Sequence, residues 1–118
     1  MYATLHTDLC RLNKAEMVES HGFPYYGYTM VVESNGVRRA TIYLRSDLPA
    51  LVTRSVLAHE QYHSQDPEFL TSSVFTRELK ANVAGFKETP VGFFQGFFMS
   101  LFDVDRVVLY FKRIVGNF

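Results

Sequence analysis

The pattern of apolar and polar residues predicts a β-hairpin in the first half of the chain. The segments Tyr25–Glu33 and Val37–Arg45 are rich in tyrosine, valine, threonine and isoleucine, which favour extended strands. They flank Ser34–Gly36, where the Asn-Gly pair tolerates the positive φ angles of a tight turn. Because side chains alternate between the two faces of a strand, one face of the second segment would carry Ala40, Ile42 and Leu44.

A capping pattern predicts a short helix before this hairpin. Asn13 is followed three positions later by Glu16, and this spacing is typical of a capping box, in which each side chain bonds the backbone of the other residue. The helix would end before His21–Pro24, because glycine and proline in this segment interrupt helical structure.

A longer helix is predicted directly after the hairpin. Ser46 and Asp47 can cap its first turn, and Pro49 is tolerated there because the first helical residues need no backbone N–H. The helix would run to about Gln65, since Pro67 bars its continuation.

Three more helices are expected in the second half. A helix over Ser72–Gly85 would have a stripe formed by Phe75, Leu79, Asn82 and Phe86. After a turn at Lys87–Pro90, an aromatic helix is expected over Val91–Phe102. Helical spacing then continues at Val104, Val107, Val108, Phe111 and Ile114. The predicted order is therefore one helix, a hairpin and four helices, which together indicate a single α+β domain over residues 1–118.

Composition and charge narrow the classes of function. The chain has 118 residues, of which 47% are hydrophobic, and 12 basic residues balance 12 acidic ones. Its zero net charge gives no general attraction to nucleic acid. Cys10 is the single cysteine, so an internal disulfide is excluded. Without a visible secretory signal or an apolar stretch of about 20 residues, we expect a cytoplasmic protein with no transmembrane segment.

The segment from His59 to His63, with the sequence His-Glu-Gln-Tyr-His, predicts a metal site. Residues four apart lie one above the other on a helix, so both imidazoles can bind one ion at about 2.0 to 2.1 Å. Glu60 lies on the same broad face. In sites of this type such a glutamate acts as a general acid and base and does not bind the metal.

Two histidines leave one protein ligand to be found. Asp66 lies seven residues beyond His59, roughly 10 Å along a continuous helix, which is too far unless the helix breaks first. Glu78 is better placed on the following helix, which can fold back close to the first because Ala81 and Gly85 are small. Asn82, one turn beyond Glu78, could orient a ligating imidazole from outside the ligand shell.

The segments His59-Glu60-Gln61-Tyr62-His63 and Glu78-Leu79-Lys80-Ala81-Asn82 resemble the gluzincin arrangement of zinc metallopeptidases. The resemblance is closest to the minimal ImmA/IrrE-like family and covers about residues 38 to 86. It implies a zincin-like fold with Zn²⁺ bound by His59, His63 and Glu78, Glu60 as the catalytic base, and a strand beside the cleft that binds peptide. Because several such proteins are encoded by phages or mobile elements and cleave a repressor, it also implies regulatory proteolysis of one protein partner.

Two other functions remain open at this point. A binding protein could keep the metal for stability alone, using the phenylalanine-rich C-terminal helices for self-association. A membrane-surface module could use the same helices, although they lack the rim of lysine and arginine typical of such modules. An oxyanion-stabilising residue is not assigned, and the candidates are Tyr25, Tyr26, Tyr28, Tyr43 and His21.

Overall fold

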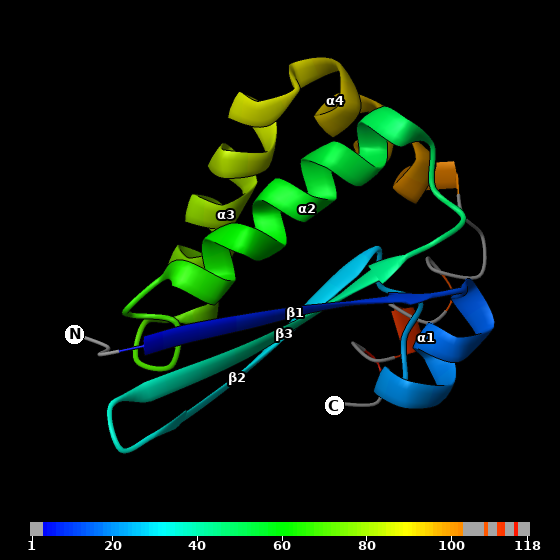
Figure 1. Ribbon diagram of the computed structural model, residues 1–118. Helices are drawn as coiled ribbons and strands as arrows, with labels where there is room; N and C mark the ends of the chain where they lie inside the picture. Colours follow the sequence, from blue (N-terminus) through cyan, green and yellow to red (C-terminus); the bar gives the residue numbers. More distant parts are fainter. Residues whose placement is uncertain (1–3, 103–107, 109–110, 113–114, 116–118) are drawn as a thin grey trace.

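The computed structural model describes residues 4–102, 108, 111, 112 and 115. Within these residues the protein is a small α+β structure with three strands and four helices, as Figure 1 shows. The elements in chain order are β1 (Thr4–Leu12), α1 (Lys14–His21), β2 (Gly27–Ser34), β3 (Val37–Arg45), α2 (Ala50–Gln65), α3 (Val74–Glu88) and α4 (Pro90–Phe102).

The predicted hairpin forms the antiparallel pair β2 and β3, with Asn35 and Gly36 in the turn at φ angles of 52° and 77°. The sheet has a third strand, β1, which pairs parallel to β3 and gives the order β1-β3-β2. The strand β1 was not predicted from the sequence. Its apolar residues Leu5, Leu9 and Leu12 are spaced by four and three positions, so they do not show the alternation of a strand.

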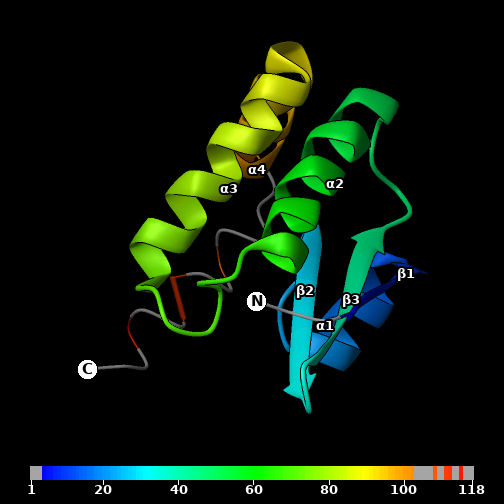
Figure 2. The same cartoon turned by 60° about the vertical axis from the view of Figure 1, so that its left-hand side comes forward.

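The core lies between the sheet and α2. On β3, Ala40, Ile42 and Leu44 face α2 and are buried, which confirms the predicted alternation, and Val52 of α2 is buried as well. Figure 2 shows the sheet, α2 and the α3/α4 pair as successive layers, with α1 on the far side of the sheet. The helix α2 is therefore the central element, in contact with β2, β3, α3 and α4.

The start of α1 is as predicted, but the helix ends at His21, one residue later than expected, and the start of α2 also differs. Asn13 accepts a hydrogen bond from the backbone N–H of Glu16, and the Glu16 carboxylate accepts one from the N–H of Asn13. The predicted caps of α2 are wrong, since it begins at Ala50 after Pro49 without a side-chain cap. Asp47 instead accepts two hydrogen bonds from Arg45, at 2.8 and 2.9 Å.

The next two helices are shifted from their predicted bounds. The helix α3 begins two residues later than expected, where Ser73 accepts a hydrogen bond from the N–H of Thr76, and it continues to Glu88. The predicted turn at Lys87–Pro90 is therefore confined to Thr89, whose extended backbone separates α3 from α4. The end of α2 at Gln65 is as predicted.

The apolar surfaces of α3 and α4 differ most from expectation. The stripe that contains Phe75 and Leu79 is exposed, while the narrow face with Ala81 and Gly85 packs on α2. On α4 only Gly92 and Gly96 are buried, so the phenylalanines of this helix do not form part of the core.

Of the next predicted helix, Val104, Val107 and Ile114 lie outside the described residues. Within the described part, no helix is both long and apolar enough to cross a membrane.

Candidate metal centre

The last two turns of α2 bring the two predicted histidine ligands together. The Nε2 atoms of His59 and His63 lie 3.1 Å apart. His63 is 3% exposed, and its ring packs beside the ring of Phe69. The histidines are therefore held on a helix that packs against both the sheet and α3.

Glu78 reaches the same point from α3. One carboxylate oxygen, Oε2, lies 3.0 Å from Nε2 of His59, and the other, Oε1, lies 3.2 Å from Nε2 of His63. The close approach of the two helices depends on Gly85, where an added Cβ would lie 2.9 Å from the backbone oxygen of Ser55. The Ser55 hydroxyl also donates a hydrogen bond to the backbone oxygen of Gly85.

These distances are compatible with a metal ion bound among the three groups. In tetrahedral coordination at 2.0 to 2.1 Å, neighbouring ligand atoms are about 3.3 Å apart, and the three distances among the groups are 3.0 to 3.2 Å. Glu60 is also near, since one potential ligand atom each from His59, Glu60 and His63 lies within 4.8 Å of the others. Glu78 is the stronger candidate for a third ligand, because its carboxylate contacts both imidazoles directly.

The electrostatics distinguish the two carboxylates. Burial alone would raise the pKa of Glu78, but its hydrogen bonds to His59 and His63 outweigh this effect and hold the pKa well below its usual range. Burial raises the pKa of Glu60, which is 4% exposed, although the nearby histidines oppose the shift. Glu78 is therefore a stable anion, whereas Glu60 is suited to accept and release a proton.

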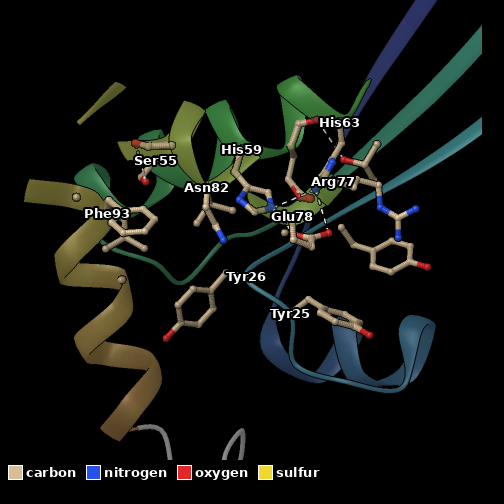
Figure 3. Close-up of a pocket in the computed structure, with 18 of the residues that line it drawn as sticks. Tyr25, Tyr26, Ser55, His59, His63, Arg77, Glu78, Asn82 and Phe93 are labelled. Atoms are coloured by element: carbon tan, nitrogen blue, oxygen red, sulfur yellow. Dashed lines mark hydrogen bonds and ion pairs between the residues drawn. The ribbon is translucent and has the colours of Figure 1, made fainter. Parts of the chain in front are cut away.

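Asn82 lies beside His59, where sequence analysis placed it. Burial lowers the pKa of His59, but the hydrogen bond to Glu78, the charge of Glu60 and a side-chain hydrogen bond with Asn82 together raise it. In Figure 3, His59, Asn82 and Glu78 point toward the same cavity from α2 and α3. Asn82 can therefore fix the orientation of the His59 ring.

A cavity of about 820 Å³ opens in front of these side chains. Tyr25 and Tyr26 line the side opposite the histidines, and Phe93 lies at the end toward α4 (Figure 3). Tyr28 also lines the cavity, whereas His21 stacks on the Tyr28 ring at 4.5 Å. The cavity is large enough for several residues of a bound peptide.

Two residues that shape this site, Gly27 and Arg38, were not predicted from the sequence. Gly27 begins β2, and a Cβ added there would lie 2.8 Å from Cγ of Glu60. Arg38 is fully buried and donates hydrogen bonds to the backbone at the end of α2. A glycine at a strand end can signal a close approach, but an arginine in a strand gives no sign of its partners.

Asp66 does not join the centre. It follows the last residue of α2, and its carboxylate accepts a hydrogen bond from the N–H of Glu68 at 2.9 Å. Asp66 therefore caps the C-terminal end of α2.

No family model matches the chain, and no curated protein or solved structure matches it either. The gluzincin resemblance thus stays a prediction from the two motifs.

Proposed function

We propose that this protein is a zinc-dependent endopeptidase of the gluzincin type. The observation that carries the proposal is the convergence of His59, His63 and Glu78, whose contacting atoms lie 3.0 to 3.2 Å apart. Two imidazoles and one carboxylate are a donor set that suits catalytic zinc. Glu60 lies next to them in a buried position, as a peptidase of this type requires.

A bound zinc ion would supply Lewis acidity, which lowers the pKa of a water molecule and polarises a peptide carbonyl. Glu60 would take a proton from the attacking water and pass it to the departing amine. Its raised pKa favours this exchange, because burial stabilises the protonated form of the carboxyl group. Asn82 would hold the His59 ring, and the histidines would stay neutral when they bind the ion.

The proposed substrate is an extended segment of a peptide or protein. The strand β2 lies at the edge of the sheet, and its first residues, from Gly27 to Thr29, line the cavity. An edge strand can pair with an extended peptide through backbone hydrogen bonds. Regulatory cleavage of one protein partner is the narrower form of this hypothesis.

Metal analysis combined with a protease assay tests the proposal. Wild type and Glu60→Gln should each hold about one zinc per chain, and only wild type should cleave labelled casein. His63→Ala and Glu78→Ala should lose both metal and activity. Absence of bound zinc in the wild type, or cleavage by Glu60→Gln at the wild-type rate, would overturn the endopeptidase proposal.

The exposed face of α4 favours a second candidate function, a metal-stabilised protein that associates with a second copy of itself. Phe94, Phe97, Phe98 and Phe102 are 50%, 53%, 55% and 80% exposed. At roughly 200 Å² per side chain, they expose on the order of 500 Å². Val91 and Leu101 add to this area, which approaches the ~800 Å² that each partner buries in a stable dimer.

A second copy fits this face better than a charged partner or a membrane, because α4 carries no charged residue. Sedimentation equilibrium tests this candidate. The wild type should be a dimer, and the double variant Phe94→Ser/Phe98→Ser should be a monomer with unchanged zinc content. Val32→Ser, an exposed apolar control on β2, should stay dimeric. A monomeric wild type at high micromolar concentration would contradict the candidate.

A further inference from the structure

A buried arginine on the sheet holds the turn of α2 that carries His63. Arg38 is 0% exposed. Its Nη1 donates a hydrogen bond to the backbone oxygen of Asp66 at 2.6 Å, and its Nη2 donates one to the backbone oxygen of His63 at 3.2 Å. We infer that Arg38 is a positioning residue for the metal ligand His63, an inference that rests on the zinc site proposed above.

The end of α2 needs such a donor. The last carbonyl groups of a helix have no partner within the helix, and Pro67 cannot donate a backbone hydrogen bond. The N–H of Asp66 contacts the oxygen of His63 only at 3.4 Å. The planar guanidinium of Arg38 has several donors in fixed directions, so it can bind both carbonyls at once and fix the last turn.

The position of Arg38 in the strand argues against a role in packing alone. It continues the row of Ala40, Ile42 and Leu44 on the face of β3 that is turned toward α2. An aliphatic side chain would suit that row and avoid the cost of burying a charge. The charge is balanced by the partly negative end of the helix and by Glu33, whose Oε1 lies 3.6 Å from Nη1.

Arg38 restrains the backbone position of a proposed metal ligand. The backbone of His63 is bound to the sheet through Arg38, while Glu78 reaches the same point from α3 on the other side of α2. Groups that orient metal ligands without touching the metal commonly change metal affinity by 10- to 100-fold when they are removed. Loss of Arg38 should therefore weaken zinc binding in addition to lowering stability.

Arg45 offers a matched control on the same strand. It is also buried, and it donates hydrogen bonds to the backbone oxygen of Pro24 and to the carboxylate of Asp47. It touches neither the end of α2 nor a proposed ligand. Arg45→Met and Arg38→Met therefore both remove a buried arginine, but only the second change affects the turn of His63.

The experiment measures the zinc dissociation constant by chelator competition and the melting temperature of the zinc-free protein, for wild type, Arg38→Met, Arg38→Lys and Arg45→Met. Both methionine variants should melt earlier than wild type. Only Arg38→Met should bind zinc about 10-fold or more weakly. Arg38→Lys should recover part of the affinity, because an ammonium group can still bind one carbonyl.

Two results would overturn the inference. One is wild-type zinc affinity in Arg38→Met, and the other is an equal loss of affinity in Arg38→Met and Arg45→Met. If Arg38→Met does not fold, Arg38→Lys decides, and a zinc affinity equal to that of wild type in this variant counts against the inference. A wild type that binds no zinc would instead contradict the proposed function itself, so the two failures are distinguishable.

Discussion

The two sides of α3 differ sharply in their surroundings, although they belong to one helix. The side facing α2 has small residues, Ala81 and Gly85, which are buried, and it places Glu78 beside the histidines. The outer side carries Phe75 and Leu79, which are 77% and 53% exposed. The close approach of α3 to α2 therefore depends on small residues, whereas the large apolar residues of α3 remain available for other contacts.

The same division continues in α4. Its glycines pack on α2, where a Cβ at Gly96 would lie 3.2 Å from a methyl group of Val52. Its phenylalanines are largely exposed. The inner side of the helices therefore determines the geometry of the candidate metal centre, and we expect changes on the two sides to have effects of different size and kind.

Zinc removal should have the largest effect on the inner side. A ligand present at about 1,000 times its dissociation constant stabilises the folded state by about 4 kcal/mol, which corresponds to a rise on the order of 15 °C in melting temperature for a chain of this size. Calorimetry with zinc and with a chelator should show this difference in wild type. In His63→Ala zinc should no longer raise the melting temperature. A rise as large as that of wild type in this variant would argue that His63 is not a ligand.

Gly85→Val should have the next largest effect. The Cβ of the added valine would lie 2.9 Å from the backbone oxygen of Ser55. Because α3 must then move away from α2, the free energy of unfolding should fall by roughly 1 to 3 kcal/mol. Denaturant unfolding would measure this decrease, and zinc affinity should fall because Glu78 moves with α3. Val83→Ala, at an exposed position on the same helix, is the control and should change neither quantity appreciably.

Gly27→Ala should separate catalysis from metal binding. The new Cβ would lie 2.8 Å from Cγ of Glu60, while Glu60 is not a proposed ligand. We expect zinc affinity close to wild type and kcat lowered by about 10-fold, equivalent to about 1.4 kcal/mol. Steady-state peptidase kinetics with a parallel zinc titration would measure both. An unchanged kcat would show that the position of Glu60 tolerates this displacement.

Phe98→Ser should have the smallest effect on the fold. An exposed side chain outside a packed core usually changes the free energy of unfolding by less than about 0.5 kcal/mol, and zinc affinity should be unaffected. Chemical denaturation below the concentration at which the protein associates would test this. A loss of several kcal/mol would mean that the outer face of α4 is buried in the folded chain, which would remove the contrast between the two sides.

The sequence predicted those parts of the molecule whose signals are local. The turn at Asn35 and Gly36, the capping box at Asn13 and the end of α2 before Pro67 each depend on residues close together in the chain. The proximity of His59 and His63 follows from helical spacing in the same way. The approach of Glu78 could be anticipated from the small residues that follow it on α3.

Features that depend on distant partners could not be predicted. The strand β1 forms only by pairing with β3, more than 30 positions away, and its own apolar spacing resembles a helix. Asp47 was expected to cap α2, but Arg45 competes for its carboxylate. The function of Arg38 depends on carbonyl groups 25 and 28 residues further along the chain. Exposure of the α4 phenylalanines likewise depends on what packs nearby.

X-ray absorption spectroscopy at the zinc edge of the metal-loaded protein tests whether His59, His63 and Glu78 bind the ion. We expect four light ligand atoms at about 2.0 to 2.1 Å, with the multiple-scattering signature of two imidazole rings, and loss of the metal in Glu78→Ala. A first shell that contains sulfur, or one without imidazole scattering, would contradict a centre built from His59, His63 and Glu78.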